Sequence, residues 1–242
     1  MVSGEHIDGY IKSLIPELPA ELEKIEEDAN YRGVPIIRKD MQQLMRFLIG
    51  MHKPAKVLEI GTAVGFSSLF MAECISPDAA LSPSSFEIIT IEKDERMYAE
   101  AVLNISASRH ADNIKAFKAD AAEFLENEEK LKENAGFDMI FIDAAKAQYR
   151  RYIEIILERG LIRKNGLIIT DNILQEGSIA ESKFTIVRRD RTIHKRLRDY
   201  VKFLMTDPGF ETVLVPTGDG AALTNYLGKE NQPAYVLQGR HI

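Results

Sequence analysis

The sequence is short of several features, and each shortage excludes a class of protein. Its 242 residues include one cysteine, so an intramolecular disulfide is excluded and a cytoplasmic protein is favoured. No stretch approaches the roughly 20 apolar residues of a membrane-spanning helix. The N-terminus also lacks the basic segment and apolar run of a signal peptide. We therefore expect no association with a membrane.

Positive charge is in short supply over the chain as a whole. Lysine and arginine number 31 against 37 aspartate and glutamate residues, which gives a net charge of −6. The molecule has no overall excess of positive charge to attract nucleic acid, although this does not exclude a local basic patch. Because 45% of the residues are hydrophobic, the chain can bury a large core. One domain spanning residues 1–242 is the expectation.

The order of apolar patterns predicts an α/β fold. Residues 1–54 have helical spacing, and strand-like runs then alternate with helical ones, which indicates a parallel sheet with helices on both faces. The predicted strands are 56–60, 87–91, 114–119, 137–142 and 167–170, with helices near 67–76, 95–109, 121–133 and 147–159 between them.

The C-terminal part predicts a different connection. A long helix near 189–205 precedes two strands that flank Gly218-Asp219-Gly220. An Asp-Gly pair between apolar runs is a strong signal for a hairpin, so one strand of the sheet should be antiparallel. We expect a helical cap over 1–54, a Rossmann-like core over 55–227 and a tail over 228–242.

Polar residues follow two of the predicted strands. Asp143 and Lys146 come after FDMIFI, and Asp171 and Asn172 come after LIIT. The carboxyl ends of parallel strands form the ligand crevice of an open α/β sheet, so these side chains should converge. Two carboxylates and an amide suit a hard divalent cation, with an amine as a base beside it. Alone, each has an ordinary explanation, since Asp-Asn pairs are common in turns and lysines are usually solvated.

A second group predicts a nucleotide-like ligand. Gly61 and Gly65 form a turn between a strand and a helix, but their spacing and the absence of a basic residue disfavour a pyrophosphate. Glu59 suits an ammonium group, Glu92 suits ribose hydroxyls, and Asp120 suits an adenine amino group. S-adenosylmethionine has all three features and no phosphate. The alternative is an ordinary glycine turn with solvated acidic residues at the strand ends.

The motifs VLEIGTAVGFSS, TIEKDERM, FIDAAKAQY and TDNIL resemble the cation-dependent O-methyltransferases, the group of the catechol and caffeoyl-CoA enzymes. The resemblance runs from about residue 35 to 227. It implies a class I methyltransferase fold of seven strands, with the last strand antiparallel. We therefore expect an S-adenosylmethionine-dependent O-methyltransferase. A catalytically silent protein that only binds this cofactor is a distant alternative.

The resemblance also implies roles for individual residues. Asp143, Asp171 and Asn172 would hold Mg²⁺, although Mn²⁺ and Ca²⁺ accept the same oxygen ligands. Lys146 would be the general base. The expected contacts of the methyl donor are Met41, Glu59, Gly61, Gly65, Ser67, Glu92, Asp120, Ala121 and Asp143.

Two features of the sequence bear on the molecule that accepts the methyl group: a missing tryptophan and a basic segment. The catechol branch has a tryptophan beside its metal-binding aspartate, whereas this chain has Ala144-Ala145 there and no tryptophan at all. Residues 183–202 are unusually basic for an acidic protein, which suits a phosphate backbone, although a solvated helix face is an equal alternative. The candidate RNA-binding residues are Arg188, Arg189, Arg191, Lys195 and Arg198.

This basic segment, with IPELPAELEKIEEDA and VPIIRKD, is similar to the bacterial tRNA 5-hydroxyuridine methyltransferases of the same family. The similarity implies a tRNA acceptor, whose 5-hydroxyl and 4-carbonyl oxygens are neighbours as in a catechol. A small catechol or similar phenol is the alternative acceptor. We also expect a homodimer, and the helices of residues 1–54 could mediate it or cover the acceptor.

Overall fold

The computed structural model describes residues 4–77, 86–129, 131, 136–175, 177–182 and 184–228. The predicted tail, apart from Gly228, lies outside the described residues. The chain groups into two compact units: unit 1 is Met1–Ala55 with Gly61–Ala119, and unit 2 is Lys56–Ile60 with Asp120–Ile242. The single domain stays a prediction.

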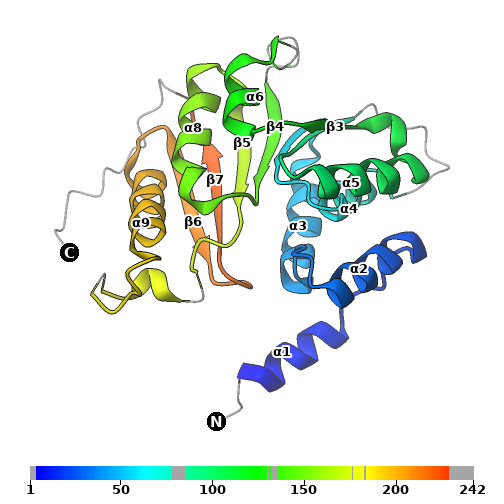
Figure 1. Cartoon of the computed structure of the whole chain (residues 1–242), viewed down its shortest axis with the longest axis horizontal. Coiled ribbons are helices and arrows are strands. Elements are labelled where there is room, and N and C mark those ends of the chain that lie inside the picture. Colours follow the sequence, from blue (N-terminus) through cyan, green and yellow to red (C-terminus); the bar gives the residue numbers. More distant parts are fainter. Residues whose placement is uncertain are drawn as a thin grey trace. The chain divides into compact units, whose positions relative to one another are not determined.

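Seven strands form one sheet in the order β3-β2-β1-β4-β5-β7-β6 (Figure 1). The pairs β2–β3, β1–β4 and β4–β5 are parallel, whereas β7 is antiparallel to both of its neighbours. The predicted seven-stranded, mostly parallel sheet with an antiparallel last strand is confirmed. The strands are β1 (Lys56–Ile60), β2 (Glu87–Glu92), β3 (Ile114–Lys118), β4 (Phe137–Ile142), β5 (Ile162–Thr170), β6 (Phe210–Val215) and β7 (Ala221–Tyr226).

The strand register in unit 2 sets where the candidate site lies. Every residue of β4 is buried, as expected for a parallel strand covered on both faces. Ile142, the last residue of β4, is paired with Ile60 of β1 and with Thr170 of β5, so these three strands end level with one another. The chain therefore leaves β4 and β5 at neighbouring points, directly before Asp143 and Asp171.

Strand β5 is longer than the sequence predicted. It begins at Ile162 rather than 167, and its pairing with β4 shifts register between Phe137 and Met139. Asn165 has a φ of 62° in this stretch, a left-handed conformation that asparagine tolerates better than most residues. The polar residues around this irregularity interrupt the apolar run, which explains why the pattern revealed only the second half of the strand.

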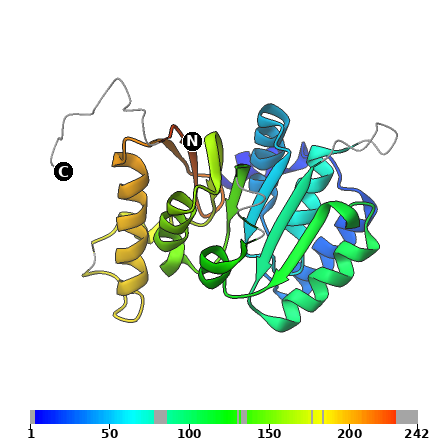
Figure 2. The ribbon, with the colours of Figure 1, turned by 90° about the horizontal axis from the view of Figure 1, so that it is seen from above.

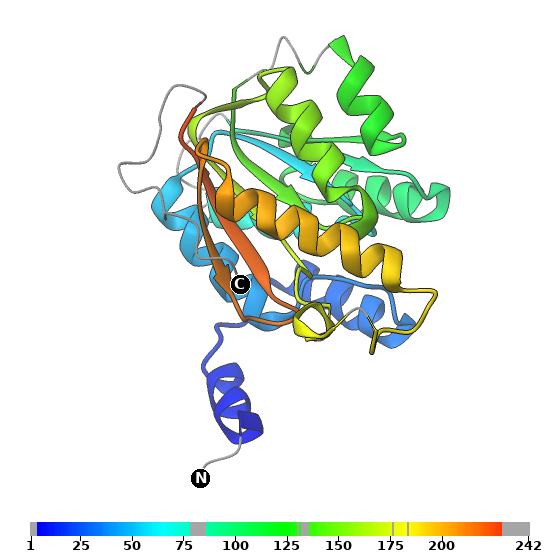
Figure 3. The same ribbon diagram turned by 90° about the vertical axis from the view of Figure 1, so that its left-hand side faces the viewer.

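The helices of unit 2 form a layer over its strands. Figure 3 shows α9 (Arg191–Thr206), α8 (Tyr149–Glu158) and α6 (Ala121–Asn127) side by side in front of the sheet. Helix α6 ends earlier than the predicted 133, because Glu128 is already extended. The apolar face of α9 is buried at Leu197, Tyr200 and Leu204. His194 on the same helix is also buried, which the apolar pattern does not predict.

Unit 1 contains the remaining helices and the pair β2–β3. Its helices are α1 (Gly4–Ser13), α2 (Ala20–Arg32), α3 (Lys39–His52), α4 (Phe66–Ile75) and α5 (Glu95–Ala107). Helix α5 runs along the two strands (Figure 2). Its first turn is capped by the carboxylate of Asp94, which accepts bonds from the backbone N–H groups of Arg96 and Met97.

Helix α1 leaves apolar side chains exposed. Tyr10 is 67% exposed and Ile7 49%. Such a surface is compatible with a partner, but the homodimer and the role of residues 1–54 stay predictions. Within the described part of the chain, no helix combines the length and the hydropathy needed to cross a membrane.

The turn before α4 depends on a glycine, and we expect its replacement to be costly. Gly65 has a φ of 84°, and an added Cβ would lie 3.3 Å from the Cα of Ala101. Gly33→Ala is a matched control, because Gly33 also has a positive φ of 68° but has open space where a Cβ would be. Gly33→Ala should lower the free energy of unfolding by about 1–2 kcal/mol. Gly65→Ala should lower the free energy of unfolding, measured by urea denaturation, by more than Gly33→Ala does. If the two variants lose the same free energy of unfolding, the close packing of Gly65 against Ala101 of α5 is contradicted.

Candidate active site

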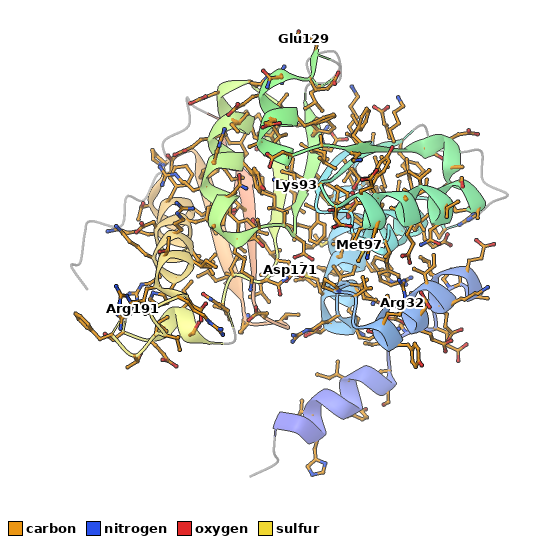
Figure 4. All side chains as sticks on the ribbon, viewed as in Figure 1. Arg32, Lys93, Met97, Glu129, Asp171 and Arg191 are labelled. Carbon is orange, nitrogen blue, oxygen red and sulfur yellow. The ribbon has the colours of Figure 1, made fainter. Side chains whose placement is uncertain are left out.

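Asn172 joins the two carboxylates that follow β4 and β5. Its side-chain Nδ2 donates to Oδ1 of Asp143 at 2.9 Å, and its backbone N donates to Oδ1 of Asp171 at 2.6 Å. Its φ of 58° is left-handed, and the short polar side chain of asparagine makes that conformation accessible. Figure 4 labels Asp171 in this region. The structure thus brings together all three residues that the sequence predicted as metal ligands.

The two carboxylates are largely buried, and Asp143 is costly to keep charged in this position. Asp171 is only 7% exposed. Burial raises the pKa of Asp143, while the hydrogen bond from Asn172 and the charge of Lys146 act in the opposite direction. A buried carboxylate is stabilised by a nearby cation. Burial therefore makes the charged form of Asp143 costly even with Lys146 nearby, and a further cation beside Asp143 would lower that cost.

The chemistry of the donor set fits a hard divalent cation. Two carboxylates and an amide offer oxygen ligands, which Mg²⁺, Mn²⁺ and Ca²⁺ prefer. Within the described ranges, no group of three or more histidine, cysteine, aspartate and glutamate side chains is arranged to hold a metal ion. The candidate set of Asp143, Asp171 and Asn172 contains only two such side chains, and the third ligand would be the amide.

Lys146 reaches a carboxylate that the sequence does not assign to the site. It begins the short 3₁₀ turn η2 (Lys146–Gln148), and its Nζ lies 3.0 Å from Oδ2 of Asp219. The Lys146 side chain is 28% exposed and that of Asp219 only 7%. The sequence predicts only a turn at Asp219. Its partnership depends on β7 lying beside β5, which no local sequence signal reveals.

Tyr149 supports the backbone of the site. Its ring is fully buried, and its hydroxyl donates to the carbonyl oxygen of Asp171 at 3.2 Å. Burial, with the charges of Asp143 and Asp171, raises the hydroxyl pKa well above 10, so the phenol stays a hydrogen-bond donor. The ring packs edge-on against Tyr200 of α9, with ring centroids 5.6 Å apart. Helices α8 and α9 therefore help to hold the end of β5.

In unit 1, the predicted methyl-donor residue Glu92 is bonded to the backbone of the glycine turn. Gly61 has a φ of 103°, as a tight turn requires. Glu92 accepts backbone bonds from Ala63 N at 2.9 Å and Asp94 N at 2.8 Å, one on each oxygen. A carboxylate has about four acceptor sites, so ribose hydroxyls could still bind to it. Met41 and Ser67, two further predicted contacts, are buried in the same unit.

In unit 2, the other predicted contacts already have structural roles. Asp120 caps α6, because its Oδ1 accepts bonds from the backbone N of Ala122 at 3.0 Å and of Glu123 at 3.4 Å. Ala121 is the first residue of that helix and is buried. Glu59 has no exposed surface, so a contact with a ligand's ammonium requires its surroundings to move. The contacts of these residues with a methyl donor stay predictions.

The predicted RNA-binding residues lie just before α9 and along its first half. A hollow of about 860 Å³ is lined by Arg191, Lys195 and Arg198, with exposed Phe184 beside them. Arg191 is labelled in Figure 4. Two of these arginines also hold the preceding segment: Arg191 Nε donates to the Ile186 carbonyl at 3.0 Å, and Arg198 Nη1 to that of Glu181 at 3.0 Å. Arg188 and Arg189 are exposed outside this lining.

Comparisons with known proteins give the family. The O-methyltransferase family model matches residues 15–227. A catechol O-methyltransferase from Niastella koreensis is 29% identical over 184 residues, covering 75% of this chain and 78% of its own. A crystal structure from Staphylococcus aureus, provisionally named as a caffeoyl-CoA O-methyltransferase, is 32% identical, with a TM-score of 0.78 and coverage of 90% of this chain and 98% of its own.

The fold is shared more widely. An SAH-bound methyltransferase from Podospora anserina is 24% identical and has a TM-score of 0.77, with coverage of 92% of this chain and 94% of its own. The predicted Rossmann-like class I methyltransferase fold is thereby confirmed. Because the family model covers most of the chain, the protein belongs to this O-methyltransferase family and is an enzyme that transfers a methyl group to an oxygen atom.

Proposed function

We propose that this enzyme is a divalent-cation-dependent O-methyltransferase that uses S-adenosylmethionine, with Lys146 as the proton acceptor. The observation that supports it most is the linked group of Asp143, Asn172 and Asp171, with Lys146 close enough to act on the charge of Asp143. An acidic oxygen-ligand site beside an amine suits the activation of a hydroxyl group.

Asp143, Asp171 and Asn172 would hold the cation. Bound there, a divalent cation would act as a Lewis acid and make a nearby hydroxyl more acidic. Asn172 orients both carboxylates through its two hydrogen bonds, and Tyr149 fixes the backbone of Asp171. The ligand side chains are therefore held in position before any cation binds, which lowers the cost of organising the site.

The glycine turn and the acidic strand ends would hold the methyl donor. S-adenosylmethionine supplies a methyl group on a positively charged sulfur, which an oxygen nucleophile can take. Gly61 and Gly65 allow a close approach to the backbone, and Glu92 would accept the ribose hydroxyls. Glu59 and Asp120 stay candidates for the amino group and the adenine.

Lys146 would take the proton of the acceptor hydroxyl. Its Nζ, in the neutral form, accepts the proton as the O–H bond breaks and becomes an ammonium. Because the side chain is 28% exposed, water can afterwards receive that proton. A positioned general base contributes about 10²–10⁴-fold to a rate.

The proposed acceptor is 5-hydroxyuridine in tRNA. The positive residues along the hollow beside α9 support a phosphate backbone, and exposed Phe184 offers a surface on which a base can stack. The second candidate is a small catechol or similar phenol, which is favoured by the catechol O-methyltransferase among the relatives. Both acceptors present two neighbouring oxygens to the same cluster.

Lys146→Ala tests the role of the base. We expect kcat to fall about 10²–10⁴-fold while the affinities for Mg²⁺ and S-adenosylmethionine, measured by calorimetry, change little. Lys202→Ala, which removes an exposed lysine on α9, is the control and should keep wild-type turnover. Normal turnover by Lys146→Ala would sink the assignment.

The double variant Arg188→Gln and Lys195→Gln tests the acceptor. These residues are chosen because Arg191 and Arg198 also hold backbone carbonyls. We expect weaker tRNA binding, and a slope of log affinity against log salt that is shallower by about 1 per residue replaced. Methylation of a small catechol should be unchanged, and Lys24→Gln on α2 controls for a general loss of charge. If both acceptors respond alike, the basic face is not an RNA surface.

A further inference from the structure

The connection between β6 and β7 is fastened to the chain that follows the candidate metal ligands. The backbone N of Ile173 donates to the carbonyl of Gly220 at 3.0 Å, and that of Leu174 to the carbonyl of Asp219 at 2.8 Å. Ile173 comes directly after Asn172. The connection and the ligand segment are therefore joined by backbone bonds, and these bonds use the carbonyl of Asp219, not its carboxylate.

Gly220 allows this close contact. Its φ is +81°, and an added Cβ would lie 2.1 Å from Cγ of Leu174, so the backbone passes directly over that side chain. Its N–H also closes the turn by donating to the Thr217 carbonyl at 2.8 Å. Asp219 consequently has little freedom, and its carboxylate is held in a nearly fully buried position facing Lys146.

We propose that Asp219 is the positioning residue for Lys146: it aims Nζ and stabilises the ammonium that forms when Lys146 takes a proton. This proposal rests on the proposed function of Lys146 as the base. The carboxylate is not expected to touch the acceptor. Its action is like that of the aspartate in a serine-protease triad, which orients the base and stabilises its charged form without itself taking up the proton.

The geometry of the pair supports this role. An ammonium–carboxylate hydrogen bond of 3.0 Å is directional, and it is stronger than a neutral one. Lys146 has a long flexible side chain, which without this bond would sample several rotamers. Two acidic groups act on this ammonium: Asp219 through the ion pair and Asp143 through an electrostatic interaction. Removing the Asp219 charge should therefore shift Nζ away from its aimed position.

The test compares wild-type enzyme with Asp219→Asn, which keeps the shape and removes the charge, and with Asp219→Glu, which restores the charge. The first readout is acetylation of Lys146 by acetic anhydride in protein free of metal and methyl donor, followed by mass spectrometry with Lys195 as the internal reference. We expect acetylation in Asp219→Asn to be at least about fivefold faster, because a hydrogen bond to the charged amine is lost. Asp219→Glu should return part of the way to the wild-type rate.

The second readout is steady-state kinetics. In Asp219→Asn, kcat should fall about 10- to 100-fold while KM for the acceptor stays within about twofold, since misplacing a base affects the chemical step. Asp138→Asn is the matched control: Asp138 has the same 7% side-chain exposure and pairs with Arg163 at 2.7 Å, but lies at the opposite end of β4. It should leave both kcat and the acetylation of Lys146 unchanged.

Two results would overturn the proposal: unchanged acetylation of Lys146 in Asp219→Asn, or unchanged kcat. If Asp219→Asn does not fold, Asp219→Ser is a second neutral variant to which the same criteria apply. Failure of the proposed function is distinguishable, because full activity of Lys146→Ala would contradict the base itself. The acetylation experiment needs no turnover, so it still reports whether Asp219 controls the amine.

Discussion

The candidate site depends on one constraint: β4 and β5 end side by side at the same edge of the sheet. Because Ile142 pairs with Thr170, the chain turns out of both strands at adjacent points. Asp143 and Asp171 follow at once, and the left-handed Asn172 bonds to both. A shift of either strand by one residue would also turn its side chains to the opposite face. The buried and mostly apolar β4 fixes this register, so the hydrophobic core determines the geometry of the polar cluster.

Segments far apart in the sequence complete this arrangement within unit 2. Tyr149 from α8 holds the backbone of Asp171, while Asp219 from the β6–β7 connection pairs with Lys146. Backbone bonds join that connection to the residues after Asn172. The antiparallel strand β7 thus has a consequence for chemistry: its place beside β5 brings a carboxylate to the amine. The strand order that defines the fold therefore also determines which side chains meet in the candidate site.

The sequence predicted what local patterns determine. The buried strands β1 and β4 have the predicted bounds, since each is a short and mostly apolar run, and the polar residues at their ends marked candidate ligands. It did not predict the first half of β5, where Asn165 interrupts the run. It also could not pair Lys146 with Asp219, because that contact follows from the strand order, and a turn aspartate has an ordinary local explanation.

The central claim is that Asp143, Asp171 and Asn172 form a divalent-cation site in an O-methyltransferase. Anomalous diffraction from crystals soaked in Mn²⁺ tests it most directly, because the ion is located without reference to turnover. The account predicts an anomalous peak at coordination distance, about 2–2.5 Å, from oxygens of all three side chains. Crystals saturated with Mn²⁺ that show no peak there, or a peak only elsewhere in the molecule, would contradict it.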